Sequence, residues 1–238
     1  EGLGAAEDGV DQPPFRVELR DGTVYTTDAF IAASGASART LGVPGEEELM
    51  GYGLSTCATC DGAFFRDEDM LVVGGGDAAM EEANFLTKFA DTVYIVHRRE
   101  EFRVEDVWID RTMQNVEEGN IELRLNTELT EIHGTPEDGI DRVTLVEHPD
   151  GHPTEKLADP ATADAVDEYD FDVGAVFFAI GHTPNTDFLE GTGAEFDDEV
   201  RLYPHLGIFP VVNDDLSVIE REGGIPLGIE RRFRWFGR

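Results

Sequence analysis

The stretch Met70-Leu-Val-Val-Gly-Gly-Gly-Asp-Ala-Ala79 decides the fold, because an apolar strand pattern here runs directly into a glycine loop. Residues 80–90 then carry apolar side chains at helical spacing, with charged side chains between them. A second short apolar run follows at 93–96. The order strand, glycine loop, helix, strand within about 30 residues predicts a βαβ unit, and therefore a Rossmann-like α/β fold.

The glycine loop has the form of a dinucleotide-binding fingerprint, Gly74-x-Gly76-x-x-Ala79. Gly74 permits the tight turn, Gly76 lets a pyrophosphate approach the backbone, and Ala79 allows close packing of helix against strand. Asp77 and Ala78 begin the helix, whose N–H groups and dipole favour phosphate. An ordinary strand–helix turn is the alternative interpretation of the same glycines.

A basic segment follows the second strand of this unit. It consists of His97, Arg98 and Arg99, with Arg103 one turn later. An NAD site needs an acid at this place for the ribose 2′-hydroxyl, whereas arginines pair with a 2′-phosphate. The segment therefore predicts NADPH as the cofactor, and a solvated basic cluster is the alternative.

The two cysteines of the chain form a Cys57-Ala-Thr-Cys60 pair with Asp61 directly behind it. A structural zinc site would need two further ligands, and the six histidines lack ligand spacing with the pair. Two inert buried cysteines at this spacing would be a coincidence. The spacing closes a small disulfide loop and lowers the thiol pKa, so a redox dithiol is favoured.

Composition narrows the function classes. A net charge of −33 over 238 residues argues against nucleic acid, since phosphate would be repelled. No apolar run is long enough to span a membrane, and no secretory signal is visible. With no cysteines beyond one pair, a disulfide framework is excluded, so the expected location is cytoplasmic. Only Lys88 and Lys156 are lysines among eighteen basic residues. An acidic, lysine-poor chain predicts adaptation to high salt, and disorder is the alternative.

Five stretches together carry a family resemblance. They are Ala29-Phe-Ile-Ala-Ala-Ser-Gly-Ala-Ser-Ala-Arg39, Cys57-Ala-Thr-Cys-Asp-Gly62, the fingerprint from Gly74 to Ala79, His97-Arg-Arg99 with Phe102-Arg103, and Gly181-His-Thr-Pro-Asn-Thr186. In this order they resemble the low-molecular-weight thioredoxin reductases of the pyridine nucleotide–disulfide oxidoreductase superfamily. The resemblance covers residues 15 to about 198.

The resemblance implies an electron relay from NADPH through FAD to the Cys57–Cys60 disulfide, and from there to thioredoxin. In the family the second cysteine faces the flavin, so Cys60 takes that role and Cys57 attacks the partner's disulfide. Asp61 matches the acid/base group that exchanges protons with the thiols. A helix N-cap is the alternative role for Asp61. The family also implies a homodimer.

The flavin site is the part of the family pattern that the chain matches least. The matching positions are Ser34, Gly35, Ile180, Gly181 and His182. No FAD fingerprint precedes residue 15, and the pattern fades after about residue 199. The expectation is a fragment with an incomplete flavin domain. Two alternatives remain open: a reductase of another dithiol protein, and an inactive NADPH-binding remnant.

The predicted architecture is an NADPH-binding domain inserted in an incomplete FAD-binding domain of the three-layer ββα type. The predicted parts are 1–40 as the flavin-domain remnant, 41–173 as the NADPH domain with the CxxC pair, 174–200 as the return segment, and 201–238 as a divergent tail.

Further elements are predicted from periodicity and turn residues. A strand pair is expected at 15–19 and 23–25, and a short strand at 29–33. Residues 42–53 form a predicted connection, and 109–119 hold a second helix. Strands at 121–125, 129–133 and 140–146 are expected to form one small antiparallel sheet. Residues 150–172 form a predicted solvated loop, and 175–180 a last buried strand.

Overall fold

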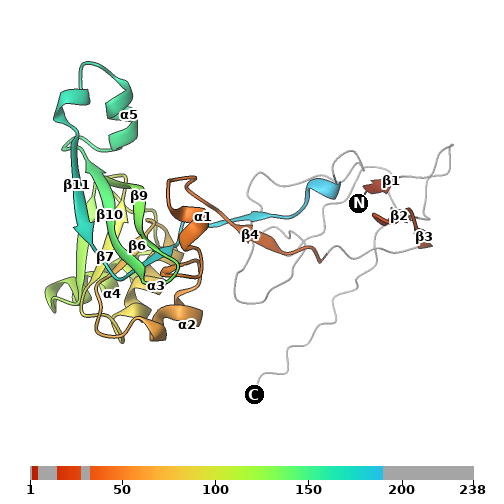
Figure 1. Ribbon diagram of the computed structural model, residues 1–238, viewed down its shortest axis with the longest axis horizontal. Coiled ribbons are helices and arrows are strands. Elements are labelled where there is room, and N and C mark those ends of the chain that lie inside the picture. The colour runs from red at the N-terminus through yellow and green to blue at the C-terminus, as the bar shows by residue number, and fades with distance from the viewer. Residues whose placement is uncertain (1, 5–14, 28–32, 190–238) are drawn as a thin grey trace. The chain divides into compact units, whose positions relative to one another are not determined.

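The computed structural model of the protein describes residues 2–4, 15–27 and 33–189 (Figure 1). Contacts divide the chain into two units, one of residues 38–183 and one of residues 1–37 with 184–238. The predicted strand at 29–33 lies mostly outside the described residues, and so does the predicted tail at 201–238.

A five-stranded parallel sheet forms the centre of the unit 38–183. Its strands run in the order β5 (Leu54–Ser55), β12 (Ala175–Phe178), β6 (Met70–Val73), β7 (Val93–His97) and β8 (Ile121–Leu125). All four pairings are parallel. The predicted βαβ unit is confirmed, with the first strand at the predicted residues.

Alternate residues of each central strand enter two different cores. In β6, Met70 and Val72 belong to one buried cluster, while Leu71 and Val73 belong to the other. Because successive side chains of a strand point to opposite faces, the sheet is buried on both sides. Such burial explains why these strands read as continuous apolar runs.

Two helices cover one face of the sheet. They are α3 (Asp77–Leu86) and α4 (Asp106–Glu117). Met80, Ala83 and Leu86 are fully buried in the cluster beneath α3, as their helical spacing predicts. Asn84 of α3 donates a 2.7 Å hydrogen bond to the Thr112 hydroxyl of α4, which ties the two helices together. No helix in the described ranges is both long and apolar enough to cross a membrane.

An antiparallel sheet covers the other face of the parallel sheet. Its strands are β9 (Thr127–Thr135), β10 (Gly139–Glu147) and β11 (Asp167–Asp172), with β10 in the centre. Its inward side chains share a core with the parallel sheet. The α/β class with a parallel sheet is therefore confirmed. The three-layer ββα arrangement predicted for the flavin domain stays a prediction.

Three sequence predictions in this region are wrong. The strand at 121–125 is the outer strand of the parallel sheet rather than part of the antiparallel one. The expected loop at 150–172 contains α5 (Pro153–Ala158), a 3₁₀ turn at Ala163–Ala165 and strand β11. The connection at 42–53 contains α1 (Glu46–Leu49). The first error concerns only the sheet to which a correctly predicted strand belongs. In the other two cases tertiary contacts order a segment whose polar composition predicts little structure.

The buried carboxylate of Glu46 explains why the connection is ordered. Its Oε2 accepts hydrogen bonds from the backbone N–H groups of Leu41, Gly42 and Val43, at 3.0, 2.7 and 3.3 Å. Glu46 is only 6% exposed. One acidic side chain therefore holds the loop that leads into the unit.

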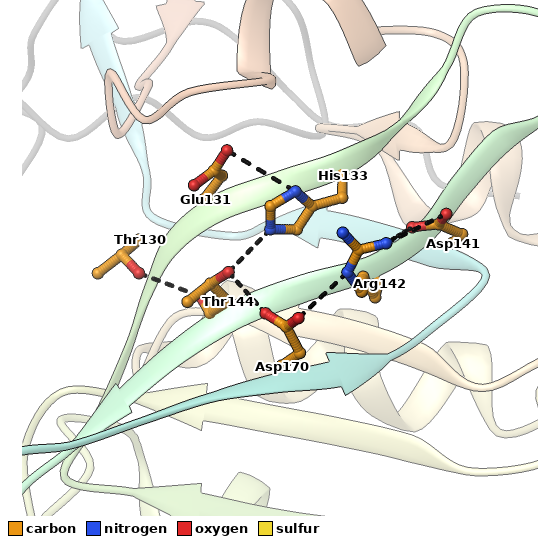
Figure 2. Close-up of polar contacts among 7 residues, drawn as sticks. All are labelled: Thr130, Glu131, His133, Asp141, Arg142, Thr144 and Asp170. Atoms are coloured by element: carbon orange, nitrogen blue, oxygen red, sulfur yellow. Dashed lines mark hydrogen bonds and ion pairs between the residues drawn. The ribbon is translucent and has the colours of Figure 1, made fainter.

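The outer face of the antiparallel sheet carries a chain of polar contacts, shown in Figure 2. His133 Nε2 lies 2.8 Å from the Thr144 hydroxyl, which donates to Asp170 at 3.0 Å. Asp170 also pairs with Arg142, 3.3 Å away. Since the single proton of Thr144 goes to Asp170, Thr144 and His133 do not form a nucleophile–base pair. These contacts join β9, β10 and β11 and support their register.

The other unit contains β1 (Gly2–Gly4), β2 (Phe15–Glu18) and β3 (Val24–Thr27), paired antiparallel in that order. The predicted strand pair around Asp21-Gly22 is confirmed. A two-stranded ribbon of β4 (Ala36–Ala38) and β13 (His182–Pro184) contains both points at which the chain passes from one unit to the other.

We predict that Gly45→Ala destabilises the fold more than Gly42→Ala. Both glycines have positive φ, 83° and 72°. A Cβ at Gly45 would lie 2.0 Å from the Ile132 carbonyl oxygen, whereas nothing lies within 4 Å of one at Gly42. The steric clash should add about 1–3 kcal/mol to the loss of unfolding free energy.

The measurement is urea unfolding of the two variants and the wild type, in buffer with molar KCl. Equal losses for the two variants would show that backbone strain alone decides the cost at residue 45.

Candidate functional site

The candidate functional segments follow the carboxyl ends of the parallel strands. The CxxC turn follows β5, the glycine loop follows β6, the basic segment follows β7, and residues 179–181 follow β12. The register aligns Val73 with Val96 and with Phe178 across three neighbouring strands. Ligands of open α/β sheets bind at this edge.

The CxxC turn holds the two sulfurs together. Cys57 and Cys60 form a disulfide, with Cα atoms 5.3 Å apart. Helix α2 (Ala58–Asp61) begins between them, and the N–H groups of Cys60 and Asp61 donate to the Cys57 carbonyl. Cys57 is half-buried and Cys60 is exposed. The disulfide agrees with the redox interpretation of the pair.

Asp61 ends α2 and stands at the N-cap position of the 3₁₀ turn at Gly62–Phe64. Its side chain makes no capping hydrogen bond to the 3₁₀ turn at Gly62–Phe64, so the N-cap alternative is wrong. Instead, Asp61 Oδ2 accepts a 2.6 Å hydrogen bond from the hydroxyl of Ser55. The sequence analysis did not identify Ser55, although it stands two residues before the first cysteine.

Glu82 brings a carboxylate close to the CxxC turn from helix α3. Burial, followed by repulsion from Glu81, raises the pKa of Glu82 to about 7, and the backbone N–H of Ala58 offsets part of the rise. Its Oε2 is buried without a hydrogen-bond partner in the described residues. Ala58 is the first residue of α2, so the Glu82 carboxylate lies at the start of the helix that contains Cys60.

A pocket of about 560 Å³ opens at the same edge of the sheet. Its walls come from residues 39–41, 73–78, 96–99, 103, 127–129 and 179–181. The structure thus brings the glycine loop and the basic segment together in one cavity. The walls at 40–41 and 127–129 carry no motif and reach the pocket only through the fold, so the sequence gives no signal for them. Arg39 ends one of the stretches that resemble the family, but nothing in that stretch predicts its place in this pocket.

The three glycines of the loop differ in what a side chain at each position would contact. A Cβ at Gly74 would lie 2.4 Å from the Ala179 carbonyl oxygen, and one at Gly75 would lie 2.1 Å from His97 Nδ1. A Cβ at Gly76 would meet nothing closer than 3.9 Å. Gly76 therefore leaves open space where the fingerprint places a pyrophosphate, beside a helix start without a side-chain cap. The residues present fit a dinucleotide.

Two hydrogen bonds from backbone N–H groups join the region of the basic segment to the glycine loop and the helix start behind it. The N–H of Arg103 donates to the Gly75 carbonyl at 2.9 Å. The N–H of Glu105 donates to Asp77 Oδ1, also at 2.9 Å. Asp77 therefore holds the site together through its side chain. Ala79 is fully buried, in agreement with close packing of helix on strand.

The four basic residues have two kinds of surroundings. Burial lowers the pKa of His97, and repulsion from the neighbouring arginines lowers it further. The hydrogen bond to the Glu101 carbonyl raises the pKa and offsets part of this shift. His97 stacks on Phe102 and contacts the Glu101 carbonyl oxygen at 3.1 Å. Arg98 and Arg103 are exposed and Arg99 is half-buried. None of the three guanidinium groups pairs with a carboxylate among the described residues.

The residues predicted to contact the flavin lie in different parts of the structure. Ile180 and Gly181 line the pocket of about 560 Å³ beside the glycine loop. The carbonyls of Ser34 and Gly35 accept hydrogen bonds from the side chain and backbone of Asn185. His182 begins strand β13 and is exposed. Binding of FAD at these residues stays a prediction.

Comparison with known proteins decides the family. The family described as pyridine nucleotide-disulphide oxidoreductase matches residues 6–205. The chain belongs to this family. Its relatives assign it to the low-molecular-weight thioredoxin reductases, which confirms the resemblance found in the sequence.

Curated relatives are similar to the chain over about three quarters of its length. The thioredoxin reductase of Mycolicibacterium smegmatis is 49% identical over 78% of the chain, and that of Escherichia coli O157:H7 is 44% identical over 75%. The glucosaminate ammonia-lyase of Pseudomonas fluorescens is 47% identical over 72%. The chain spans about half the length of these relatives. Overall identity therefore does not fix the reaction.

Solved structures agree with the fold of this family member. The thioredoxin reductase of Lactococcus lactis in its FR conformation has a TM-score of 0.64 at 30% identity. It matches 84% of the chain and 60% of its own length. The thioredoxin reductase of Giardia duodenalis has the same TM-score and identity over 85% of the chain and 60% of its own length.

We predict that Glu82→Gln stabilises the fold above pH 7 and leaves it unchanged below pH 4.5. The folded-state pKa of about 7 lies above the ordinary value of 4.5, so stability falls as the pH rises between these values. At about 1.4 kcal/mol per pKa unit, ionisation of Glu82 costs the folded protein on the order of 3 kcal/mol.

The measurement is urea unfolding of wild type and variant from pH 4 to 8. Glu137→Gln is the matched control, because Glu137 is exposed and its loss changes the net charge equally. A stability gain from Glu82→Gln that is constant over this range would contradict the prediction.

Proposed function

We propose that this chain is the NADPH-binding and disulfide-bearing part of a thioredoxin-disulfide reductase. The observation that supports it is the arrangement of the redox disulfide, a glycine loop and unpaired arginines at one edge of one parallel sheet. The compact unit 38–183 corresponds to the NADPH domain, which we propose is inserted between two segments of a flavin domain.

The nucleotide pocket supplies the groups that NADPH needs. Gly76 leaves room for the pyrophosphate, and the start of α3 presents N–H groups to it. Arg98, Arg99 and Arg103 supply charge for the 2′-phosphate. The His97 ring lies against Gly75 of the glycine loop and forms a wall of the pocket. When bound, NADPH would supply the hydride whose two electrons open the disulfide.

The flavin part of the proposal rests on the family. When bound, FAD would carry the electron pair between the nicotinamide and the disulfide. Ser34, Gly35 and residues 180–182 are the positions proposed to contact it. Cys60, which is exposed as a residue, is the cysteine proposed to face the flavin.

The reduced cysteines then exchange with a partner's disulfide. The Cys57 thiolate attacks one partner sulfur, which forms a mixed disulfide and breaks the partner's S–S bond. Asp61 gives a proton to the leaving thiolate. The Asp61 carboxylate then takes the proton of the Cys60 thiol, and the resulting Cys60 thiolate attacks the Cys57 sulfur. The Cys57–Cys60 bond re-forms, and Asp61 passes that proton to the second partner thiolate, which leaves as a thiol. Electrons and protons balance over the cycle.

An apolar side chain next to the disulfide suits a protein partner. Phe64 follows the CxxC turn and is 80% exposed. An exposed aromatic ring is a favourable anchor for a docking protein. We propose thioredoxin or a thioredoxin-like protein as the partner, a cytoplasmic location, and a homodimer by analogy with the family. A reductase of another dithiol protein and a flavin-free remnant are the alternatives.

We predict that the arginines select NADPH over NADH. Replacing Arg98 and Arg99 together by Gln should weaken NADPH binding at least about tenfold and leave NADH binding unchanged, since charged hydrogen bonds contribute about 1.5–3 kcal/mol each. Gly76→Ala should weaken both nucleotides, because its methyl group fills the open space at the pyrophosphate. Calorimetric titration gives the affinities.

The control for that experiment is Arg142→Gln, which removes a half-buried, ion-paired arginine from the outer face of the antiparallel sheet, away from the pocket. Equal affinity of the wild type for NADPH and NADH would contradict the role of the basic segment.

We predict NADPH-dependent reduction of thioredoxin in molar KCl with added FAD, followed as loss of NADPH absorbance. Cys57→Ser and Cys60→Ser should each abolish it. Phe64→Ser should slow electron transfer from the pre-reduced chain to thioredoxin about tenfold and leave a small disulfide unaffected, since only docking changes.

Each alternative gives a different result in this assay. Tight NADPH binding with no reduction of any disulfide would support the flavin-free remnant. Faster reduction of a glutaredoxin than of thioredoxin would identify another dithiol partner.

A further inference from the structure

Ser55 lies between the redox turn and the Asp61 carboxylate. Its hydroxyl oxygen accepts a 3.0 Å hydrogen bond from the backbone N–H of Cys57. Two acceptors compete for its hydrogen, Asp61 Oδ2 at 2.6 Å and the Cys57 carbonyl at 3.5 Å. A serine hydroxyl has one hydrogen, and the shorter contact to a carboxylate takes it.

The sheet holds Ser55 in place. Ser55 ends strand β5, pairs with Phe177 of β12 and is 5% exposed. Opening the disulfide separates the two sulfurs, so the CxxC turn has to adjust in each redox cycle. The Ser55 hydroxyl connects both the Asp61 carboxylate and the Cys57 N–H of that turn to a residue of the sheet. Its burial leaves little access for a water that could replace it.

The second carboxylate oxygen is available for chemistry. Asp61 Oδ1 accepts no hydrogen bond within the described parts of the chain, whereas Oδ2 is held by Ser55. Thiol–disulfide exchange needs a proton for a basic leaving thiolate. A carboxylate with one fixed and one open oxygen is suited to that transfer.

We propose that Ser55 is a positioning residue for the redox centre, which holds Asp61 so that its free oxygen carries the proton in thiol–disulfide exchange. The inference rests on the acid/base role of Asp61 in the proposed function. It requires neither NADPH, flavin nor thioredoxin, so it can be tested separately from them.

The test uses the whole chain, reduced with dithiothreitol, freed of reductant and mixed with an equal amount of a small disulfide. Glutathione disulfide has a basic leaving thiolate that needs a proton. Dithiobis(nitrobenzoate) has an aromatic leaving thiolate that is stable without one, so it serves as the internal control. Stopped-flow rates at neutral pH are compared between the two disulfides.

The key variants are Ser55→Thr and Ser55→Val, which have nearly the same shape and differ in the hydroxyl. Both are β-branched and suit a strand. We expect Ser55→Val to slow the reaction with glutathione disulfide about tenfold and the aromatic reaction by less than about twofold, and Ser55→Thr to react like the wild type. In an Asp61→Asn background, Ser55→Val should have no further effect, because the two residues act as one unit.

Three results would overturn the proposal. Equal rates for the Thr and Val variants would remove the hydroxyl from the mechanism. Equal slowing with both disulfides would indicate a general distortion of the turn. Additive losses from Ser55→Val and Asp61→Asn would show that Ser55 does not act through Asp61. Unfolding midpoints of all variants establish that the compared chains are folded.

Discussion

The parallel pairing of five strands is the constraint on which the rest of the structure depends. Because neighbouring strands run in one direction, every segment that follows a strand starts at the same edge of the sheet. The disulfide turn, the glycine loop and the basic segment are distant in sequence, yet they share that edge. The sheet must be covered on both faces to remain parallel, which is why α3 and α4 lie on one side and the β9–β11 sheet on the other.

Charge distribution sets the nucleotide pocket apart from the chain that carries it. The net charge is −33, yet three guanidinium groups at the pocket pair with no carboxylate among the described residues. An anionic ligand would therefore enter against the overall repulsion and bind to a local positive site. Screening at high salt weakens the long-range repulsion more than the short contacts at the site, since the Debye length falls to about 3 Å at 1 M. Adaptation of the chain to high salt stays a prediction.

The sequence predicts the centre of the fold well and its edges poorly. Strand β6 and the start of α3 follow from an apolar run and a helical period, which are local signals. Strand β8 was assigned to the wrong sheet because Ile121-Glu-Leu-Arg-Leu125 alternates like a half-exposed antiparallel strand, as the outer strand of any sheet can. Strand β5 has two residues and no period at all, so Ser55 could not be recognised as part of the sheet. The motifs predicted the disulfide and the nucleotide loop, whereas the remaining pocket walls depend on tertiary contacts.

The contact between Gly75 and His97 has a consequence for engineering the cofactor preference. The imidazole occupies the space in which a side chain at residue 75 would lie, and it also rests on Phe102. The basic segment therefore divides into one position that supports the backbone of the loop and three that carry surface charge. A redesign that exchanges the whole segment for an NAD-type sequence would leave a void under the glycines. One that keeps His97 and changes only the arginines alters the charge and leaves the loop supported.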